Sequence, residues 1–158
     1  MSRVLSAVLV ALVLSSLALF GVEHYWRGRG YAPVIMDSAD FWSIQRARVY
    51  ARDSIPLVFL GASRTLYAID RETVLTRLPG YAPVMLARDG EYPLATLRDL
   101  AEDTSFNGVV ICDLDAVAFS TLGIDMQRPM VDFYHQQFTP SRAMHRLLLS
   151  HWQRQSVL

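Results

Sequence analysis

The N-terminal segment constrains this chain more than any other part of it. Residues 4–22 contain no charged side chain, and three serines are their only clearly polar residues. A helix over this segment rises about 28 Å, close to the ~30 Å hydrocarbon core of a bilayer. Because no polar face interrupts the segment, a helix buried in a soluble domain is disfavoured. We therefore predict a transmembrane signal anchor over residues 1–22.

A cleaved signal peptide is the alternative to an anchor. Its apolar core is usually shorter, and Ala18-Leu19-Phe20-Gly21 is a poor cleavage site of the A-x-A type. The basic residues Arg3, Arg27 and Arg29 lie on both sides of the segment, so the positive-inside rule gives almost no margin. A very short N-terminal flank before a long domain is typical of export. We expect a single-pass protein of the bacterial inner membrane whose domain faces the periplasm.

Composition narrows the functions of the remaining chain. The 158 residues suffice for one domain, and 15 basic residues balance 15 acidic ones. A net charge of zero argues against a nucleic-acid partner. The single cysteine, Cys112, excludes an internal disulfide, and its apolar neighbours are typical of a buried, unreactive thiol.

The soluble domain is expected over residues 37–158, after a juxtamembrane linker over residues 23–36. Aromatic and basic side chains in the linker suit the membrane surface, and glycines and a proline break regular structure there. The domain is predicted to begin with a helix capped by Asp37 or Ser38 and running to about Arg52.

A β-α-β-α-β pattern follows this helix. Three short apolar runs suit buried parallel strands, and the segments between them suit crossover helices with right-handed connections. The strands are predicted over residues 57–60, 84–86 and 109–112, and the helices over residues 71–78 and 93–103. We therefore predict a flavodoxin-like α/β domain with strand order 2-1-3.

The pattern changes after Phe119, where no fourth strand is evident. The third strand would then be an open sheet edge, which favours a protein partner or self-association. Thr139-Pro140 begins a last helix, along which apolar residues recur at helical spacing, and we expect core or partner contacts from Met144, Leu147, Leu148 and Trp152.

The clearest chemical signal is the junction between the first strand and Gly61-Ala62-Ser63. Ligands of open parallel sheets bind beyond the carboxyl ends of the strands, so Ser63 stands where a nucleophile would be exposed. Thr65 replaces the second glycine of the G-x-S-x-G elbow. A plain helix-capping role for Ser63 is the alternative.

The segment Gly61-Ala62-Ser63-Arg64-Thr65 resembles the first block of SGNH/GDSL-type hydrolases. It is most similar to their membrane-anchored branch with a Gly-Ser-Ser-Arg-Thr signature, whose relatives include polysaccharide O-acetyltransferases and esterases. Residues 86–90 resemble the second block, and residues 108–115 with Phe119 resemble the third strand and its loop. The resemblance implies Ser63 as nucleophile, amides of Ser63 and Gly90 as oxyanion hole, an acylated glycan as substrate and no cofactor.

The chain departs from that family at two points. The family supplies an oxyanion asparagine after the third strand, whereas Asn107 precedes that strand here and Asp113 and Asp115 follow it. The family's Asp-x-x-His has the spacing of Asp132 and His135, a match that chance also produces. Asp113 and Asp115 also suit a metal pair, but loop carboxylates are more often solvated or capping, so no metal is predicted.

Two hypotheses follow from this pattern. The first is an envelope esterase or acetyltransferase that uses Ser63, Asp132 and His135. The second is a non-catalytic, membrane-tethered binding or assembly protein that keeps the fold. A fragment of a longer protein, a degenerate short relative and half of an assembly all fit the short sheet. We expect little or no ester hydrolysis from these 158 residues alone.

Overall fold

The computed structural model describes residues 3–50 and 53–155. The chain divides into two compact units, one formed by residues 1–36 with 144–158 and the other by residues 37–143. The boundary between them lies at residues 36 and 37. Most of the last helix, from Met144 onward, belongs to the same unit as the N-terminal helix.

The N-terminal helix α1 spans Arg3–Gly28 and is long and apolar enough to cross a membrane. It extends six residues beyond the predicted segment and takes in the first part of the expected linker. Glu23 and Arg27 lie one turn apart and form an ion pair, which supports the extra turns. The helix ends shortly before Gly30, whose φ is 86°. The non-helical linker therefore comprises residues 29–38.

Helix α2 spans Ala39–Ala47, and the 3-10 helix η1 continues it over Arg48–Tyr50. The Ser38 hydroxyl accepts a hydrogen bond of 3.1 Å from the Phe41 amide and so caps α2, as one of the two predicted caps. The predicted helix end at Arg52 lies outside the described residues.

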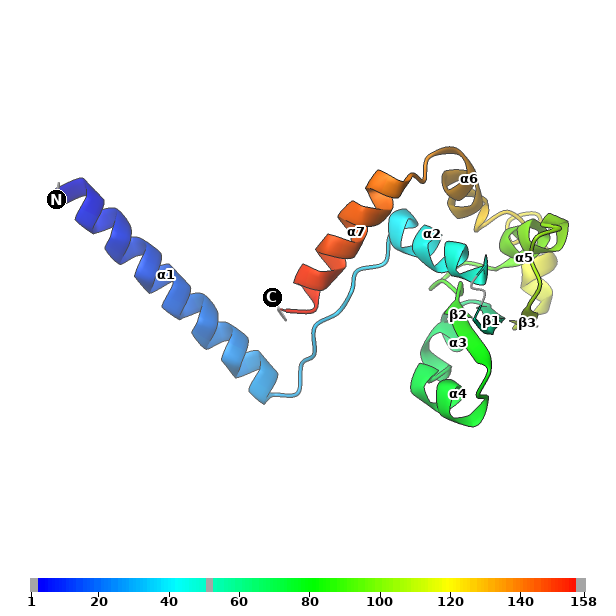
Figure 1. Ribbon diagram of the computed structural model, residues 1–158, viewed down its shortest axis with the longest axis horizontal. Coiled ribbons are helices and arrows are strands. Elements are labelled where there is room, and N and C mark those ends of the chain that lie inside the picture. Colours follow the sequence, from blue (N-terminus) through cyan, green and yellow to red (C-terminus); the bar gives the residue numbers. More distant parts are fainter. Residues whose placement is uncertain (1–2, 51–52, 156–158) are drawn as a thin grey trace. The chain divides into compact units, whose positions relative to one another are not determined.

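The sheet of the second unit has three parallel strands in the order β2-β1-β3 (Figure 1). These strands are β1 (Ile55–Leu60), β2 (Tyr81–Met85) and β3 (Val109–Cys112). The predicted α/β class, three-stranded parallel sheet and strand order are confirmed. Strands β1 and β2 begin two or three residues earlier than predicted, because both extend through prolines that a short apolar run does not include.

Short helices connect the strands. Helices α3 (Ser63–Ala68) and α4 (Arg71–Arg77) join β1 to β2, and α5 (Leu94–Glu102) joins β2 to β3. Asp70 caps α4 through a hydrogen bond of 2.8 Å from the Thr73 amide, as its position before the helix predicts. Pro93 is the N-cap of α5 rather than part of its first turn.

The two faces of the sheet are covered unequally. Helix α2 lies on one side of the strands in Figure 1, and α3 and α4 lie on the other. The main core cluster consists of eight buried residues: Trp42, Val49, Val58, Leu60, Val84, Leu86, Leu100 and Val131. On the other face, Leu57 and Phe59 of β1 are buried, but their register partners Val109 and Ile111 are 42% and 48% exposed. Strand β3 therefore presents an uncovered apolar face.

The sequence analysis missed helix α6, which spans Arg128–Gln136 and has Pro129 in its first turn. A 3-10 helix, η2 (Ala116–Phe119), precedes it. Asp132 and His135 both lie on α6. Val131 of α6 joins the core, so this helix is a packed part of the domain.

Candidate functional site

Ser63 lies at the carboxyl edge of the central strand. It is the first residue of α3 and follows the end of β1 by three positions, and its side chain is half-buried. No described residue hydrogen-bonds the Ser63 hydroxyl, either as a base or as an orienting group. The predicted nucleophile therefore has a suitable position in the sheet but no activating partner among residues 3–50 and 53–155.

The turn before Ser63 requires a glycine. A Cβ atom added to Gly61 would lie 2.1 Å from the Thr65 hydroxyl oxygen and 2.7 Å from the Thr65 Cβ. Helix α3 thus packs back on the end of β1 so closely that no side chain fits between them. The Gly61 carbonyl also accepts a hydrogen bond of 3.2 Å from the Arg88 amide, which fixes the segment after β2 beside this turn.

Asp113 closes the same turn from the side of β3. Its amide donates to the Leu60 carbonyl over 2.9 Å. Its carboxylate accepts a hydrogen bond from the Arg64 guanidinium at 3.1 Å and a longer one from the Thr65 hydroxyl at 3.5 Å. A negative group therefore stands at the strand end where the family resemblance calls for an oxyanion donor, and a carboxylate repels an oxyanion.

The segment containing Gly90 follows β2 along the same edge of the sheet. Gly90 has a φ of 70° and is exposed. Arg88 forms ion pairs with Asp37 at 3.3 Å and with Glu91 at 3.4 Å. Burial raises the pKa of Glu91, and the nearby Arg88 charge opposes that effect. These ion pairs fix the position of the chain segment that precedes Gly90.

Asp115 has a capping role. Its carboxylate accepts hydrogen bonds from the amides of Val117 and Ala118 at 2.9 and 3.2 Å, and one from the Tyr92 hydroxyl at 3.3 Å. Within the described part of the chain, no group of three His, Cys, Asp or Glu residues gathers to hold a metal ion. Cys112 is half-buried, and burial raises the pKa of its thiol.

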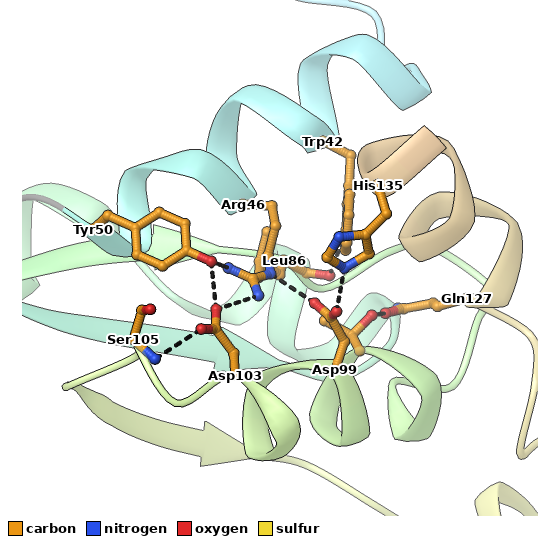
Figure 2. A network of polar contacts seen from close by, with 10 residues as sticks. Trp42, Arg46, Tyr50, Leu86, Asp99, Asp103, Ser105, Gln127 and His135 are labelled. Atoms are coloured by element: carbon orange, nitrogen blue, oxygen red, sulfur yellow. Dashed lines mark hydrogen bonds and ion pairs between the residues drawn. The ribbon is translucent and has the colours of Figure 1, made fainter. Parts of the chain in front are cut away.

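His135 is paired with an acid, but not with the one that the sequence suggested. Its Nε2 lies 2.6 Å from Asp99 Oδ1 of α5, whereas the Asp132 side chain is exposed on α6. The contact to Asp99 belongs to a polar network that joins α2, η1, α5 and α6 (Figure 2). The structure thus gives His135 a carboxylate partner without bringing Ser63 into contact with either group.

Arg46 is the centre of this network and is completely buried. Its guanidinium donates to Asp99 at 2.8 Å, to Asp103 at 2.9 Å and to the Tyr50 hydroxyl at 3.1 Å. Burial disfavours the guanidinium charge, but the hydrogen bonds to Asp99 and Asp103 outweigh it and raise the pKa of Arg46. Burial and the hydrogen bond that Tyr50 donates to Asp103 raise the pKa of Tyr50 to about 12.

Two further buried contacts continue the network (Figure 2). The Trp42 indole donates to the Leu86 carbonyl at 3.3 Å, and the Thr96 hydroxyl donates to the side-chain carbonyl of Gln127. All of these contacts fasten helices to one another and to the end of β2. We therefore interpret the network as the polar framework of the domain, with His135 at its exposed margin.

The sequence analysis did not single out Arg46, Asp99 or Asp103. Two signals were available in retrospect. Asp99 and Asp103 lie four residues apart, on the same face of the helical segment. Arg46 falls within an otherwise partly apolar helix, and a buried arginine requires acidic partners. Neither signal identifies the partner, because Arg46 and Asp99 are 53 residues apart in the chain.

A hollow of about 710 Å³ opens at the other edge of the sheet, between Tyr50, Pro56, Gly80 and Asn107. These residues precede or begin the strands, so the hollow lies at the amino edge. Open parallel sheets bind ligands at the carboxyl edge, and the hollow is not part of the Ser63 turn.

No family model, no curated protein and no solved structure matches this chain. Its interpretation therefore depends on its own residues and on the resemblance of the Ser63 segment.

Proposed function

We propose that this chain is a membrane-tethered, SGNH-like binding and assembly protein of the bacterial cell envelope, and that it does not hydrolyse esters alone. One observation carries the proposal: the carboxylate of Asp113, held by Arg64 and Thr65, closes the turn that contains Ser63. A serine hydrolase needs a base beside the nucleophile and donors around the oxyanion. Here an acidic group takes the place of the donor, and His135 hydrogen-bonds Asp99.

The proposed membrane tether is α1, which is long and apolar enough to cross a membrane. High salt and carbonate should not release the intact chain from membranes, because the apolar segment spans the hydrocarbon core. Recovery of the uncleaved chain in the soluble fraction would exclude the tether.

Assembly is supported by strand β3. It pairs with β1 on one side only, and its outward-facing Val109 and Ile111 are exposed. An open edge offers unpaired backbone donors and acceptors to another strand. The four residues of β3 carry no charge, so two copies can pair antiparallel about a two-fold axis without like-charge repulsion. A second copy of this chain is therefore the proposed partner, with an acylated glycan as a candidate ligand of the Ser63 turn.

A charge on β3 tests the assembly. Ile111→Lys should abolish cross-linking between copies in native membranes, because an edge lysine opposes strand pairing. Leu75→Lys on α4 is the matched control, since Leu75 is similarly exposed at 41% against 48% for Ile111. Equal cross-linking of both variants and the parent chain would exclude pairing through β3.

An esterase or O-acetyltransferase is the second candidate, and the position of Ser63 after the central strand favours it. Acetyl-ester hydrolysis by the full chain in detergent separates the two functions. We expect no turnover above that of Ser63→Ala, and no labelling of Ser63 by a fluorophosphonate probe. Robust turnover that Ser63→Ala and His135→Ala each abolish would instead establish an enzyme.

A further inference from the structure

Helix α7 (Pro140–Gln153) has an unusual distribution of exposed and buried side chains. Its apolar residues are exposed: Met144 by 60%, Leu147 by 53%, Leu148 by 59% and Trp152 by 74%. Positions 144, 147, 148 and 152 share one face of a helix. Two of its polar residues, Arg146 and Ser150, are only 4% and 6% exposed, whereas His145 and His151 are exposed. A surface helix of a soluble domain shows the reverse arrangement.

The polar side of α7 is held within the protein. The Arg146 guanidinium donates to the Met36 carbonyl in the linker, and Arg142 forms an ion pair of 3.2 Å with Asp40. The polar side of α7 has hydrogen-bond and ion-pair partners within the protein, and the apolar stripe lies on the opposite, exposed side. The contacts of the polar side fix which face of the helix remains exposed.

The C-terminal residues 133–158 carry a net positive charge. These residues contain Arg142, Arg146 and Arg154 and no Asp or Glu. The chain as a whole is neutral, so its C-terminal region is basic against an acidic remainder. Because Arg146 is buried and Arg142 is paired with Asp40, the exposed Arg154 is the arginine that can face anionic headgroups, while leucine and tryptophan enter the lipid.

We propose that α7 lies in the headgroup region of the membrane that α1 spans, with Met144, Leu147, Leu148 and Trp152 inserted among the lipids. This inference rests on the proposed membrane tether. The stripe is too short to pair with the same helix of a second copy. It extends only about 12 Å along the helix, whereas a coiled coil requires three to four heptads. An anionic lipid surface also complements the absence of acidic residues.

Because α1 already holds the chain at the membrane, α7 needs only a weak affinity for lipid to stay at the membrane surface. The linker of residues 29–38 spans at most about 33 Å when extended, so the domain stays close to the bilayer surface. Attachment in this range turns a second membrane contact into an intramolecular event with a high effective concentration. Two membrane-binding elements in one chain commonly give stable attachment where one alone does not.

Depth measurement with a spin label tests the insertion. The full chain carrying Cys112→Ser and Leu148→Cys is labelled and reconstituted into mixed phosphatidylcholine–phosphatidylglycerol vesicles. We expect the label at position 148 to collide more often with oxygen than with a water-soluble nickel chelate. The matched control, Thr76→Cys on exposed α4, should show the opposite preference. A label at position 148 as accessible to nickel as the control would overturn the proposal.

A second measurement uses the chain with its native cysteine. Trypsin should cleave after the exposed Arg154 several-fold more slowly in phosphatidylglycerol vesicles than in detergent. The double substitution Leu147→Gln and Leu148→Gln should restore fast cleavage while the chain stays membrane-bound after carbonate washing. Equal cleavage rates for both chains in vesicles refute the insertion of α7. Loss of the unmodified chain from the membrane would instead refute the tether itself.

Discussion

Two arginines of the same domain, Arg46 and Arg64, both pair with carboxylates but differ in their burial. Arg46 is fully buried, and the side chains of its partners Asp99 and Asp103 are 9% and 16% exposed. Arg64 and Asp113 join α3 to the end of β3, with side chains 69% and 39% exposed. The buried contacts of Arg46 hold helices together, whereas the exposed pair of Arg64 and Asp113 lies beside the turn that contains Ser63.

Burial decides how much an ion pair contributes to the stability of the fold. Removing one partner of a buried pair leaves an uncompensated charge in a low-dielectric environment, which is strongly destabilising. An exposed pair is screened by water and salt, and its loss changes stability little. The exposed pair can therefore influence the ligand preference of the Ser63 turn without being needed for the fold.

The largest effect is expected from Arg46→Met. The substitution leaves Asp99 and Asp103 buried without their cation, and we expect a loss of about 3–5 kcal/mol in the free energy of unfolding. Urea denaturation of the full chain in mild detergent, followed by far-UV circular dichroism, measures it. The combination of Arg46→Met with Asp99→Asn and Asp103→Asn should recover part of the loss. A loss below that of Arg64→Met would contradict the framework role of Arg46.

A smaller effect is expected from Gly61→Ala. The added methyl group would overlap the Thr65 side chain at the end of β1, which costs about 1–3 kcal/mol when packing must shift. The same denaturation experiment measures it, and Gly80→Ala serves as a control because a Cβ atom at Gly80 meets no neighbour within 4 Å. Gly80 has a positive φ of 97°, so the control also includes the backbone strain that this position imposes. Equal stability of the parent chain and Gly61→Ala would show that the turn adapts.

The third prediction concerns pH. The hydrogen bond from Tyr50, together with Arg46, lowers the pKa of Asp103 below its ordinary value. A lowered folded-state pKa contributes stability above the unfolded value of ~3.9, and that contribution is lost as pH falls through the folded value. Acid denaturation of Asp103→Asn should therefore show a shallower loss of stability below about pH 4 than the parent chain. Parallel acid curves for the two proteins would rule out this linkage.

The smallest effect is expected from Arg64→Ala. Because the pair with Asp113 is exposed, the free energy of unfolding should change by no more than about 1 kcal/mol. Thermal unfolding in detergent at low and high salt checks this, and the small difference should shrink further at high salt. A loss approaching that of Arg46→Met would mean that the Ser63 turn depends on this pair for its structure.

Local sequence patterns predicted the elements whose signals are short-range. The apolar run before Gly61 specifies β1, and Asp70 and Ser38 mark helix starts because a cap acts within three residues. Helix α6 was missed although Pro129 lies in its first turn, because it is only nine residues long and its packing on α2 and α5 is not visible in the sequence. The partner of His135 was missed for a similar reason, since spacing in the chain suggested Asp132 and the fold supplied Asp99.

Local hydrophobicity, turn residues and chain handedness were enough to predict an apolar N-terminal helix, the strand order and the position of Ser63 after the central strand. The contact of Asp113 with Arg64 and Thr65, the burial of Arg46 beside Asp99 and Asp103, and the outward apolar side of α7 appear only in the folded protein. Those outcomes depend on which surfaces exclude water once distant segments pack, and burial is a property of the assembled fold rather than of any one segment.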